Sequence, residues 1–149
     1  MMTQPVDSAT AIEKSAMPVK TQPVLKKRVL IIEDEPGVRI PLLIRLRNLG
    51  FKVATAHDGQ QGLEDARYLK PDLILLDLML PRLSGEEICK AIREDEDESI
   101  ANIPIIMITA KDSEVDRMVG KIIGSNAYLT KPFDFDLLHE EMRALNLVD

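Results

Sequence analysis

Pro71-Asp-Leu-Ile-Leu-Leu-Asp-Leu-Met-Leu-Pro81 contains four successive apolar residues, Leu73 to Leu76, followed by a lone carboxylate, Asp77. A short apolar run between turn signals predicts a strand that is buried on both faces. Open α/β sheets place their chemistry at the carboxyl ends of such strands. Asp77 is therefore a candidate functional residue, although a carboxylate at this place can also serve only to cap the following turn.

Four further segments carry strand patterns, and helical patterns follow each of them. The additional strands are expected at Arg28–Glu33, Phe51–Ala56, Pro104–Thr109 and Ala127–Thr130. Strands separated by helices of about ten residues have to be parallel, because only a crossover returns the chain to the same end of the sheet. The sequence thus predicts an α/β fold with a flavodoxin-like, doubly wound, five-stranded parallel sheet in the order 2-1-3-4-5 and five helices.

Local signals place the starts of several helices. Asp58 is expected to cap the second helix, and Ser84 with Glu87 forms a capping box for the third. Pro41 falls within the first helical pattern, Val38–Asn48, so that helix is expected to start late or to kink. The lone Cys89 rules out an internal disulfide and is expected to be a small core residue rather than a nucleophile.

The 149 residues suit one domain preceded by a tail. Residues 1–26 contain three prolines and no apolar periodicity, so we expect them to be disordered and residues 27–149 to form the domain. No apolar run has membrane-spanning length, and no signal-peptide pattern opens the chain. These features predict a cytoplasmic protein without membrane insertion.

Charge is unevenly distributed along the chain. The net charge is −6, but residues 1–28 carry +3, so the remainder carries −9. An acidic body argues against direct nucleic-acid binding and is compatible with a divalent cation. The basic cluster at residues 26–28 is better explained as a lead-in to the first strand than as a site for an acidic partner. The acidic run Glu94–Glu98 lacks the glycine turn and spacing of a calcium loop and predicts a solvated loop.

The predicted strand order brings several polar groups to one edge of the sheet. Glu33-Asp34 and Asp77 follow the first and third strands, which flank the switch point. Carboxylates so close raise one another's pKa unless a cation lies among them, and oxygen ligands favour Mg²⁺ or Mn²⁺. Thr109-Ala110 and Lys131 end the fourth and fifth strands and add a hydroxyl and an ammonium group. This set is suited to accepting a phosphoryl group on Asp77.

Four motifs resemble the receiver domain of two-component response regulators, in its stand-alone, chemotaxis-protein-like form. They are Ile-Ile-Glu-Asp-Glu-Pro (31–36), Leu-Leu-Asp-Leu-Met-Leu-Pro (75–81) with Ser84-Gly85, Ile-Thr-Ala (108–110) and Tyr-Leu-Thr-Lys-Pro-Phe (128–133). The resemblance implies a phosphorelay switch rather than an enzyme, apart from its own phosphorylation and autodephosphorylation. The phosphoryl donor would be a phospho-histidine on a sensor histidine kinase or a histidine phosphotransfer protein.

The resemblance also assigns roles to individual residues. Asp77 would be the phosphoacceptor. The implied metal ligands are Asp34, Asp77, the backbone carbonyl of Met79 and, through a water, Glu33. The implied contacts of the phosphoryl group are Lys131, Thr109 and Ala110, and the implied switch residues are Thr109 and Tyr128. A cis peptide is expected before Pro132.

Output is expected through protein contacts, because no further domain follows the motifs in this sequence. The face formed by the helix at about 112–123, the fifth strand and the last helix would change on phosphorylation and bind a downstream protein. The protein would be a monomer or a phosphorylation-dependent dimer.

The sequence argues against three other classes of protein. An interaction protein that no longer uses phosphate is disfavoured, because Asp34, Asp77, Thr109 and Lys131 are all present. A hydrolase of the haloacid-dehalogenase type would need an aspartate two residues after the nucleophile, where Met79 stands. A nucleotide-binding protein would need a glycine-rich loop after the first strand, where residues 33–36 are Glu-Asp-Glu-Pro.

Overall fold

A central parallel sheet organises the chain in the computed structural model, which describes residues 26–110 and 114–149. Its strands are β2 (Arg28–Ile32), β3 (Lys52–Ala56), β4 (Leu73–Leu76), β5 (Ile105–Thr109) and β6 (Ala127–Thr130). The strand order is β3-β2-β4-β5-β6, and every neighbouring pair is parallel. The predicted order 2-1-3-4-5 is therefore confirmed. The tail predicted at residues 1–26 lies outside the described residues, apart from Lys26.

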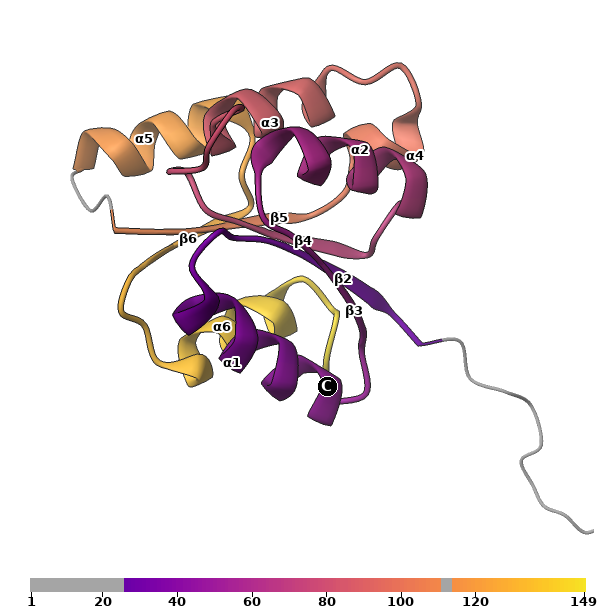
Figure 1. Ribbon diagram of the computed structural model, residues 1–149, viewed down its shortest axis with the longest axis vertical. Coiled ribbons are helices and arrows are strands. Elements are labelled where there is room, and N and C mark those ends of the chain that lie inside the picture. Colours follow the sequence, from indigo (N-terminus) through magenta and orange to yellow (C-terminus); the bar gives the residue numbers. More distant parts are fainter. Residues whose placement is uncertain (1–25, 111–113) are drawn as a thin grey trace, which may run out of the picture.

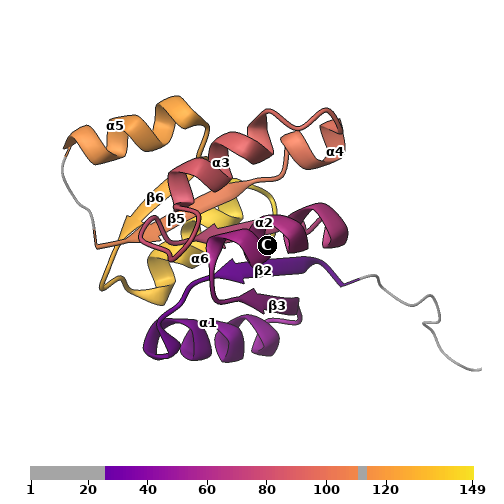
Figure 2. The ribbon, with the colours of Figure 1, turned by 45° about the horizontal axis from the view of Figure 1, so that its top comes forward.

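Helices cover both faces of the sheet (Figure 1). The described residues hold α1 (Pro36–Asn48), α2 (Gly59–Leu69), α3 (Gly85–Arg93), α4 (Glu98–Ala101), α5 (Glu114–Ile123) and α6 (Phe135–Ala144). Helices α1 and α6 lie on one face, and α2, α3 and α5 lie on the other. Figure 2 shows α3 and α5 running side by side, and residues of the two helices contact one another. The short α4 is one helix more than the sequence analysis predicted.

The apolar run of β4 is buried on both faces of the sheet. Leu73, Ile74, Leu75 and Leu76 are all fully buried. Side chains alternate along a strand, so Ile74 and Leu76 join the core under α2 and α3, whereas Leu73 and Leu75 join the core under α1 and α6. Two packed faces explain why the strand has no polar alternation. Cys89 belongs to the first of these cores and is fully buried, as expected.

Helix α1 starts earlier than predicted. Pro36 occupies its first turn, where backbone N–H groups make no hydrogen bond within the helix, so the lack of an N–H group costs nothing there. The helix runs from Pro36 through Pro41, so of the two expected outcomes, a late start or a kink, the late start is wrong. The carbonyl that Pro41 cannot bond belongs to Gly37, an exposed residue whose carbonyl water can reach. Burial of Leu42 and Leu46 against the sheet holds the helix in place despite that loss.

The acidic run after α3 is anchored to α2. Arg67 Nε lies 3.1 Å from Asp95 Oδ2, and Lys70 Nζ lies 3.0 Å from Asp97 Oδ2. Asp97 also caps α4 through its side chain. Residues 94–97 form the predicted loop, and Glu98 begins the additional helix. The run therefore has a structural use: its charges pair with α2 and start α4.

Gly85 allows α3 to begin close against the end of β4. A Cβ atom at this position would collide with the backbone carbonyl oxygen of Asp77 and would lie 2.7 Å from the Cα atom of Leu78. The Gly85 N–H donates to the Leu78 carbonyl at 3.0 Å. The predicted capping box between Ser84 and Glu87 is present and fixes the same helix start. This close packing holds the turn that carries Asp77.

Replacing Gly85 with alanine should lower the free energy of unfolding by roughly 1–3 kcal/mol, because backbone has to move to admit the methyl group. Gly37→Ala is the matched control, since no atom lies within 4 Å of a Cβ built there. In α1 that change should be neutral or stabilise by up to about 1 kcal/mol. Urea unfolding of both variants measures the difference. Equal effects would show that the close approach at Gly85 is unimportant.

Candidate functional site

The candidate site lies at the edge of the sheet where four strands end: β2, β4, β5 and β6. Ile32 at the end of β2 pairs with Leu76 at the end of β4, and Thr109 pairs with Thr130 across β5 and β6. The residues that follow these strands therefore meet at one edge of the sheet. They are Glu33, Asp34 and Glu35 after β2, Asp77 after β4, Ala110 after β5 and Lys131 after β6.

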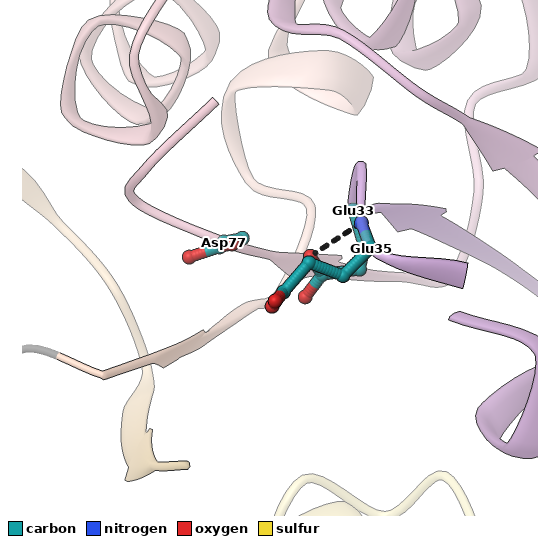
Figure 3. A group of neighbouring side chains, drawn as sticks. All are labelled: Glu33, Glu35 and Asp77. Carbon is teal, nitrogen blue, oxygen red and sulfur yellow. Dashed lines mark hydrogen bonds between the residues drawn. The ribbon is translucent and has the colours of Figure 1, made fainter. Parts of the chain in front are cut away.

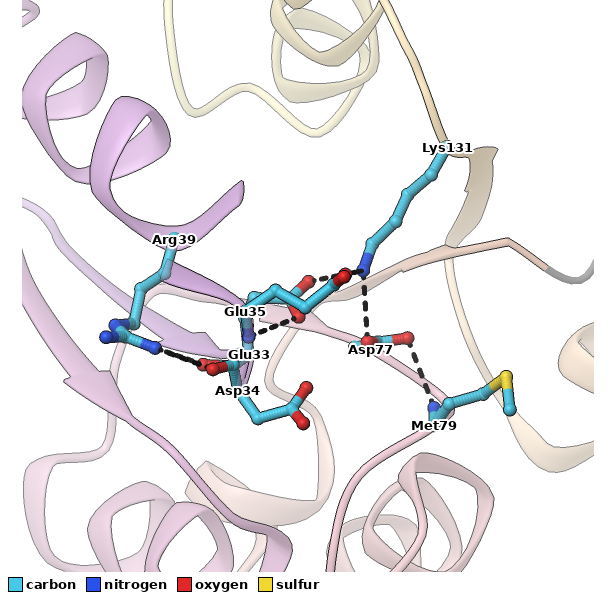
Figure 4. Close-up of polar contacts among 7 residues, drawn as sticks. All are labelled: Glu33, Asp34, Glu35, Arg39, Asp77, Met79 and Lys131. Atoms are coloured by element: carbon cyan, nitrogen blue, oxygen red, sulfur yellow. Dashed lines mark hydrogen bonds and ion pairs between the residues drawn. The ribbon is translucent and has the colours of Figure 1, made fainter. Parts of the chain in front are cut away.

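Lys131 is at the centre of the site (Figure 4). Its Nζ atom lies 2.8 Å from Glu33 Oε1, 2.8 Å from Glu35 Oε1 and 3.1 Å from Asp77 Oδ2. Burial lowers the pKa of Lys131, but its close contacts with the three carboxylates raise the pKa by more, so the net shift is upward. The same ammonium group lowers the pKa of the exposed Glu35. Lys131 therefore stays charged and partly neutralises three acids.

Glu33 is a fully buried carboxylate. Its Oε2 atom accepts a hydrogen bond from the Glu35 backbone N–H at 3.2 Å. Its Oε1 atom is an ion-pair neighbour of Lys131 but has no hydrogen-bond partner among the described residues. Burial raises the pKa of Glu33 to about 7, with a further contribution from the charge of Asp77. One lysine is thus too little compensation for the negative charge gathered here.

Asp77 is buried at the end of the central strand, with 3% of its surface exposed. Its Oδ1 atom accepts a hydrogen bond from the Met79 backbone N–H at 3.1 Å, and its Oδ2 atom contacts Lys131. The Met79 side chain itself is exposed. Both carboxylate oxygens of Asp77 are therefore oriented by neighbouring groups, which is more than the capping of a turn requires.

The carboxylates form a group that suits a hard divalent cation. Oxygen atoms of Glu33, Glu35 and Asp77 lie within 4.8 Å of one another (Figure 3). Only oxygen ligands are offered, and within the described part of the chain the buried Glu33 Oε1 has the ion pair with Lys131 but no hydrogen bond. Mg²⁺ prefers such ligands and keeps several waters, so the residues fit Mg²⁺. This cluster is consistent with the metal predicted from the sequence.

Two acidic residues differ from the sequence-based expectation. Asp34 is exposed and lies outside the group, although Figure 4 shows its side chain extending toward the side on which Asp77 and Met79 lie. Glu35 belongs to the group and was not assigned a role from the sequence. Its position beside two other acids, at the strand end that faces Lys131, is the feature of the sequence that could have indicated a role for it. Only the reach of the lysine side chain reveals which of the three acids it contacts.

The remaining predicted residues surround this centre. Thr109 is fully buried at the end of β5, and Ala110 after it is exposed. Tyr128 is half-buried on β6, and the guanidinium of Arg117 from α5 lies 5.3 Å from the centre of its ring. The peptide bond before Pro132 is cis. The structure thus brings Lys131 to Asp77, while Tyr128 lies near the start of β6 in contact with Arg117 of α5.

The raised pKa of Glu33 predicts a pH dependence of stability in metal-free protein. Folded Glu33 has a pKa of about 7 against an ordinary value of 4.5, so between these values the folded state binds a proton that the unfolded chain has released. The free energy of unfolding should therefore fall as pH rises from about 5 to about 7, by at most about 1.4 kcal/mol per pH unit.

Urea unfolding in EDTA at pH 5, 6, 7 and 8 measures this slope. Glu33→Gln has no carboxylate to titrate and should flatten the profile over the same range. An equally steep profile in that variant would assign the slope to other groups.

Comparisons with known proteins agree with this geometry. Residues 29–143 match the family described as the response regulator receiver domain. The Bacillus subtilis (strain 168) alkaline phosphatase synthesis transcriptional regulatory protein PhoP is 39% identical over 121 residues, which cover 81% of this chain and 49% of that protein. The DNA-binding response regulator MtrA of Mycolicibacterium smegmatis is 40% identical over 120 residues, covering 80% and 50%.

Solved structures give the same result. The chemotaxis response regulator CheY4 of Vibrio cholerae is 29% identical, with a TM-score of 0.74 over 81% of this chain and 99% of that chain. The receiver domain of the Francisella response regulator 1452 is also 29% identical, with a TM-score of 0.73 over 80% and 96%. The predicted fold and the predicted resemblance are both confirmed.

The chain spans about half the length of the curated relatives it matches. These relatives are named as a transcriptional regulatory protein and a DNA-binding response regulator, so the expectation of no nucleic-acid partner gains no support from them. Among the described residues, every helix falls short of the length and apolar character needed to cross a membrane. With its parallel sheet, its acidic cluster and the match over residues 29–143, the chain belongs to the response regulator receiver domain family.

Proposed function

We propose that this protein is a phosphorelay response regulator that accepts a phosphoryl group on Asp77 in a Mg²⁺-dependent reaction. The observation that carries the proposal is the contact between Asp77 and Lys131 inside a group of carboxylates. A capping carboxylate needs neither a half-buried ammonium nor two further acids beside it. Phosphoryl transfer needs this arrangement, because the transferred group carries negative charge that has to be neutralised.

The donor in this proposal is a phospho-histidine on a sensor histidine kinase or a histidine phosphotransfer protein. An Asp77 oxygen forms a bond to phosphorus, the phosphorus–nitrogen bond breaks, and its electron pair stays on the imidazole, which takes up a proton. Lys131 and the Met79 N–H hold the two Asp77 oxygens in place beforehand. Bound Mg²⁺ would neutralise phosphoryl oxygens; Asp34, Asp77 and the Met79 carbonyl would hold it directly, and Glu33 through a water.

After transfer, Lys131 pairs with the phosphoryl oxygens, and the Thr109 hydroxyl and Ala110 contact the same group. The resemblance to receiver domains implies these roles, and the position of the three residues at the ends of β5 and β6 supports them. The proposal describes a switch whose own phosphorylation and autodephosphorylation are its only reactions. It includes the cytoplasmic location expected from the sequence.

The proposed output face consists of α5, β6 and α6. Arg117 of α5 is tied to β6 by a 2.7 Å contact with Thr130 Oγ1 and by its position over the Tyr128 ring. Thr130 pairs with Thr109 across the two strands. A change at Thr109 therefore has a short physical route to Tyr128 and α5. A hollow lined in part by Arg117, Met118 and Tyr128 lies on this face.

A downstream protein would bind this face, either to a monomer or to a phosphorylation-dependent dimer. The chain spans about half the length of its curated relatives. The partners named here are therefore proposed as well, and are not carried over from those relatives.

Replacing Asp77 with asparagine should abolish labelling by acetyl phosphate in the presence of MgCl₂, because the amide cannot form the acyl phosphate. Asp136→Asn is the control, since Asp136 is exposed in the first turn of α6 and does not belong to the acidic group around Lys131. Intact-mass spectrometry should show one added phosphoryl group on the wild type and the control, and none on the Asp77 variant. Undiminished labelling of the Asp77 variant would refute the phosphoacceptor role.

Phosphorylation should shift backbone amide resonances in β6 and α5 more than those in α2 and α4, because Thr109 and Tyr128 connect the site to the former elements. Heteronuclear NMR with Mg²⁺ and beryllofluoride, a phosphoryl mimic, measures the pattern. The Asp77→Asn variant under the same conditions should show no such change. Shifts limited to residues that contact Asp77 would argue against the proposed output face.

A further inference from the structure

Arg39 reaches back from α1 to the turn that carries the acidic residues. Its Nη1 atom donates to the carbonyl oxygen of Glu33 at 3.0 Å and to that of Asp34 at 3.2 Å (Figure 4). The side chain is half-buried. One guanidinium thus holds two successive peptide groups, and both belong to residues predicted to take part in metal binding.

Other hydrogen bonds fix the N–H groups of this turn: the Glu33 N–H donates to the Ala56 carbonyl at 3.0 Å, and the Glu35 N–H donates to Glu33 Oε2 at 3.2 Å. The contacts from Arg39 act on the carbonyl groups of the turn. Strand β2 ends at Ile32, whose carbonyl accepts from the Asp77 N–H at 3.1 Å, so the next carbonyls lie beyond that strand pair. Helix α1 has no side-chain cap hydrogen bond at its N-terminus, and Pro36 has no N–H to offer. Arg39 donates instead to the carbonyl oxygens of Glu33 and Asp34, which lie just before the helix, and so ties this turn to the first turn of α1.

The direction of these bonds matters for Asp34. Figure 4 shows Arg39 on one side of the turn and the Asp34 side chain extending away from it, toward the side of Asp77 and Met79. Rotation of the peptide groups at Glu33 and Asp34 would carry the Asp34 carboxylate with it. A guanidinium bound to both carbonyls resists that rotation.

We infer that Arg39 is a positioning residue that holds the Glu33–Asp34 turn in the conformation that binds Mg²⁺. The inference rests on the proposed function, which places Mg²⁺ at this site. Arg39 would act through the backbone and would not touch the metal. Groups that orient metal ligands in this indirect way commonly change metal affinity 10- to 100-fold, in order of magnitude, when they are replaced.

Charge and positioning predict opposite results for this arginine. As a nearby positive charge alone, Arg39 would repel Mg²⁺, and its removal would tighten binding. As a clamp on the turn it favours binding, and its removal weakens binding. The sign of the change in affinity therefore distinguishes the two roles.

The test is titration of the full chain with MgCl₂, followed by calorimetry and by amide resonances of residues 33–35. Arg39→Met keeps the apolar stem and removes the donors, and it should weaken Mg²⁺ binding by roughly tenfold or more. Arg47→Met is the matched control, because Arg47 is exposed in the last turn of the same helix. Its affinity should stay within about twofold of the wild type or increase slightly.

Arg39→Lys restores a cationic donor and should recover part of the lost affinity, which a general loss of packing would not predict. If Arg39→Met does not fold, Arg39→Gln takes its place with the same expected direction. Mg²⁺ affinity equal to or tighter than that of the wild type in a folded Arg39 variant would overturn the inference alone. Absence of Mg²⁺ binding by the wild type would overturn the proposed metal site and this inference with it.

Discussion

The ammonium group of Lys131 within reach of three carboxylates is the interaction on which the site depends. Glu33 and Asp77 are buried, so each loses hydration that a surface acid would keep. The ion pairs that Lys131 forms with both carboxylates offset part of this loss of hydration free energy. Removing one partner from such a buried group commonly costs about 3–5 kcal/mol, because the remaining charge is left uncompensated. Lys131 thus holds the three carboxylates together, but its single positive charge does not neutralise all of them.

The fold makes this arrangement possible by fixing where strands end. The fully apolar β4 is packed on both faces, which leaves Asp77 no freedom to move along the strand direction. Parallel pairing then places the residue after β2 beside the residue after β4. Gly85 admits α3 close behind Asp77, so the turn is supported from the far side as well. The polar side chains do the chemistry, but the packing of the apolar core determines where they come together.

The strands, their order, the capping box and the burial of Cys89 could be predicted from the sequence, because each depends on local periodicity or on topology rules. The start of α1, the short α4 and the contact between Glu35 and Lys131 could not. Helix α4 depends on Asp97, whose side chain also pairs with Lys70 at the C-terminal end of α2. The Glu35 contact spans 96 positions in sequence and depends on one extended lysine side chain. Such features come from tertiary contacts, which no short pattern encodes.

The three partners of Lys131 are not equivalent, and this matters for switching under the proposed function. Glu35 is 62% exposed, so its ion pair with Lys131 is screened by water and is easily given up. Glu33 is fully buried, and losing Lys131 would leave its charge without compensation. If Asp77 becomes phosphorylated and draws Lys131 toward the phosphoryl oxygens, Glu33 needs either a proton or another cation. Under the proposed function, the buried glutamate would couple movement of the lysine to the binding of a divalent ion, so Glu33 as well as Asp77 would link the metal energetically to the phosphoryl group.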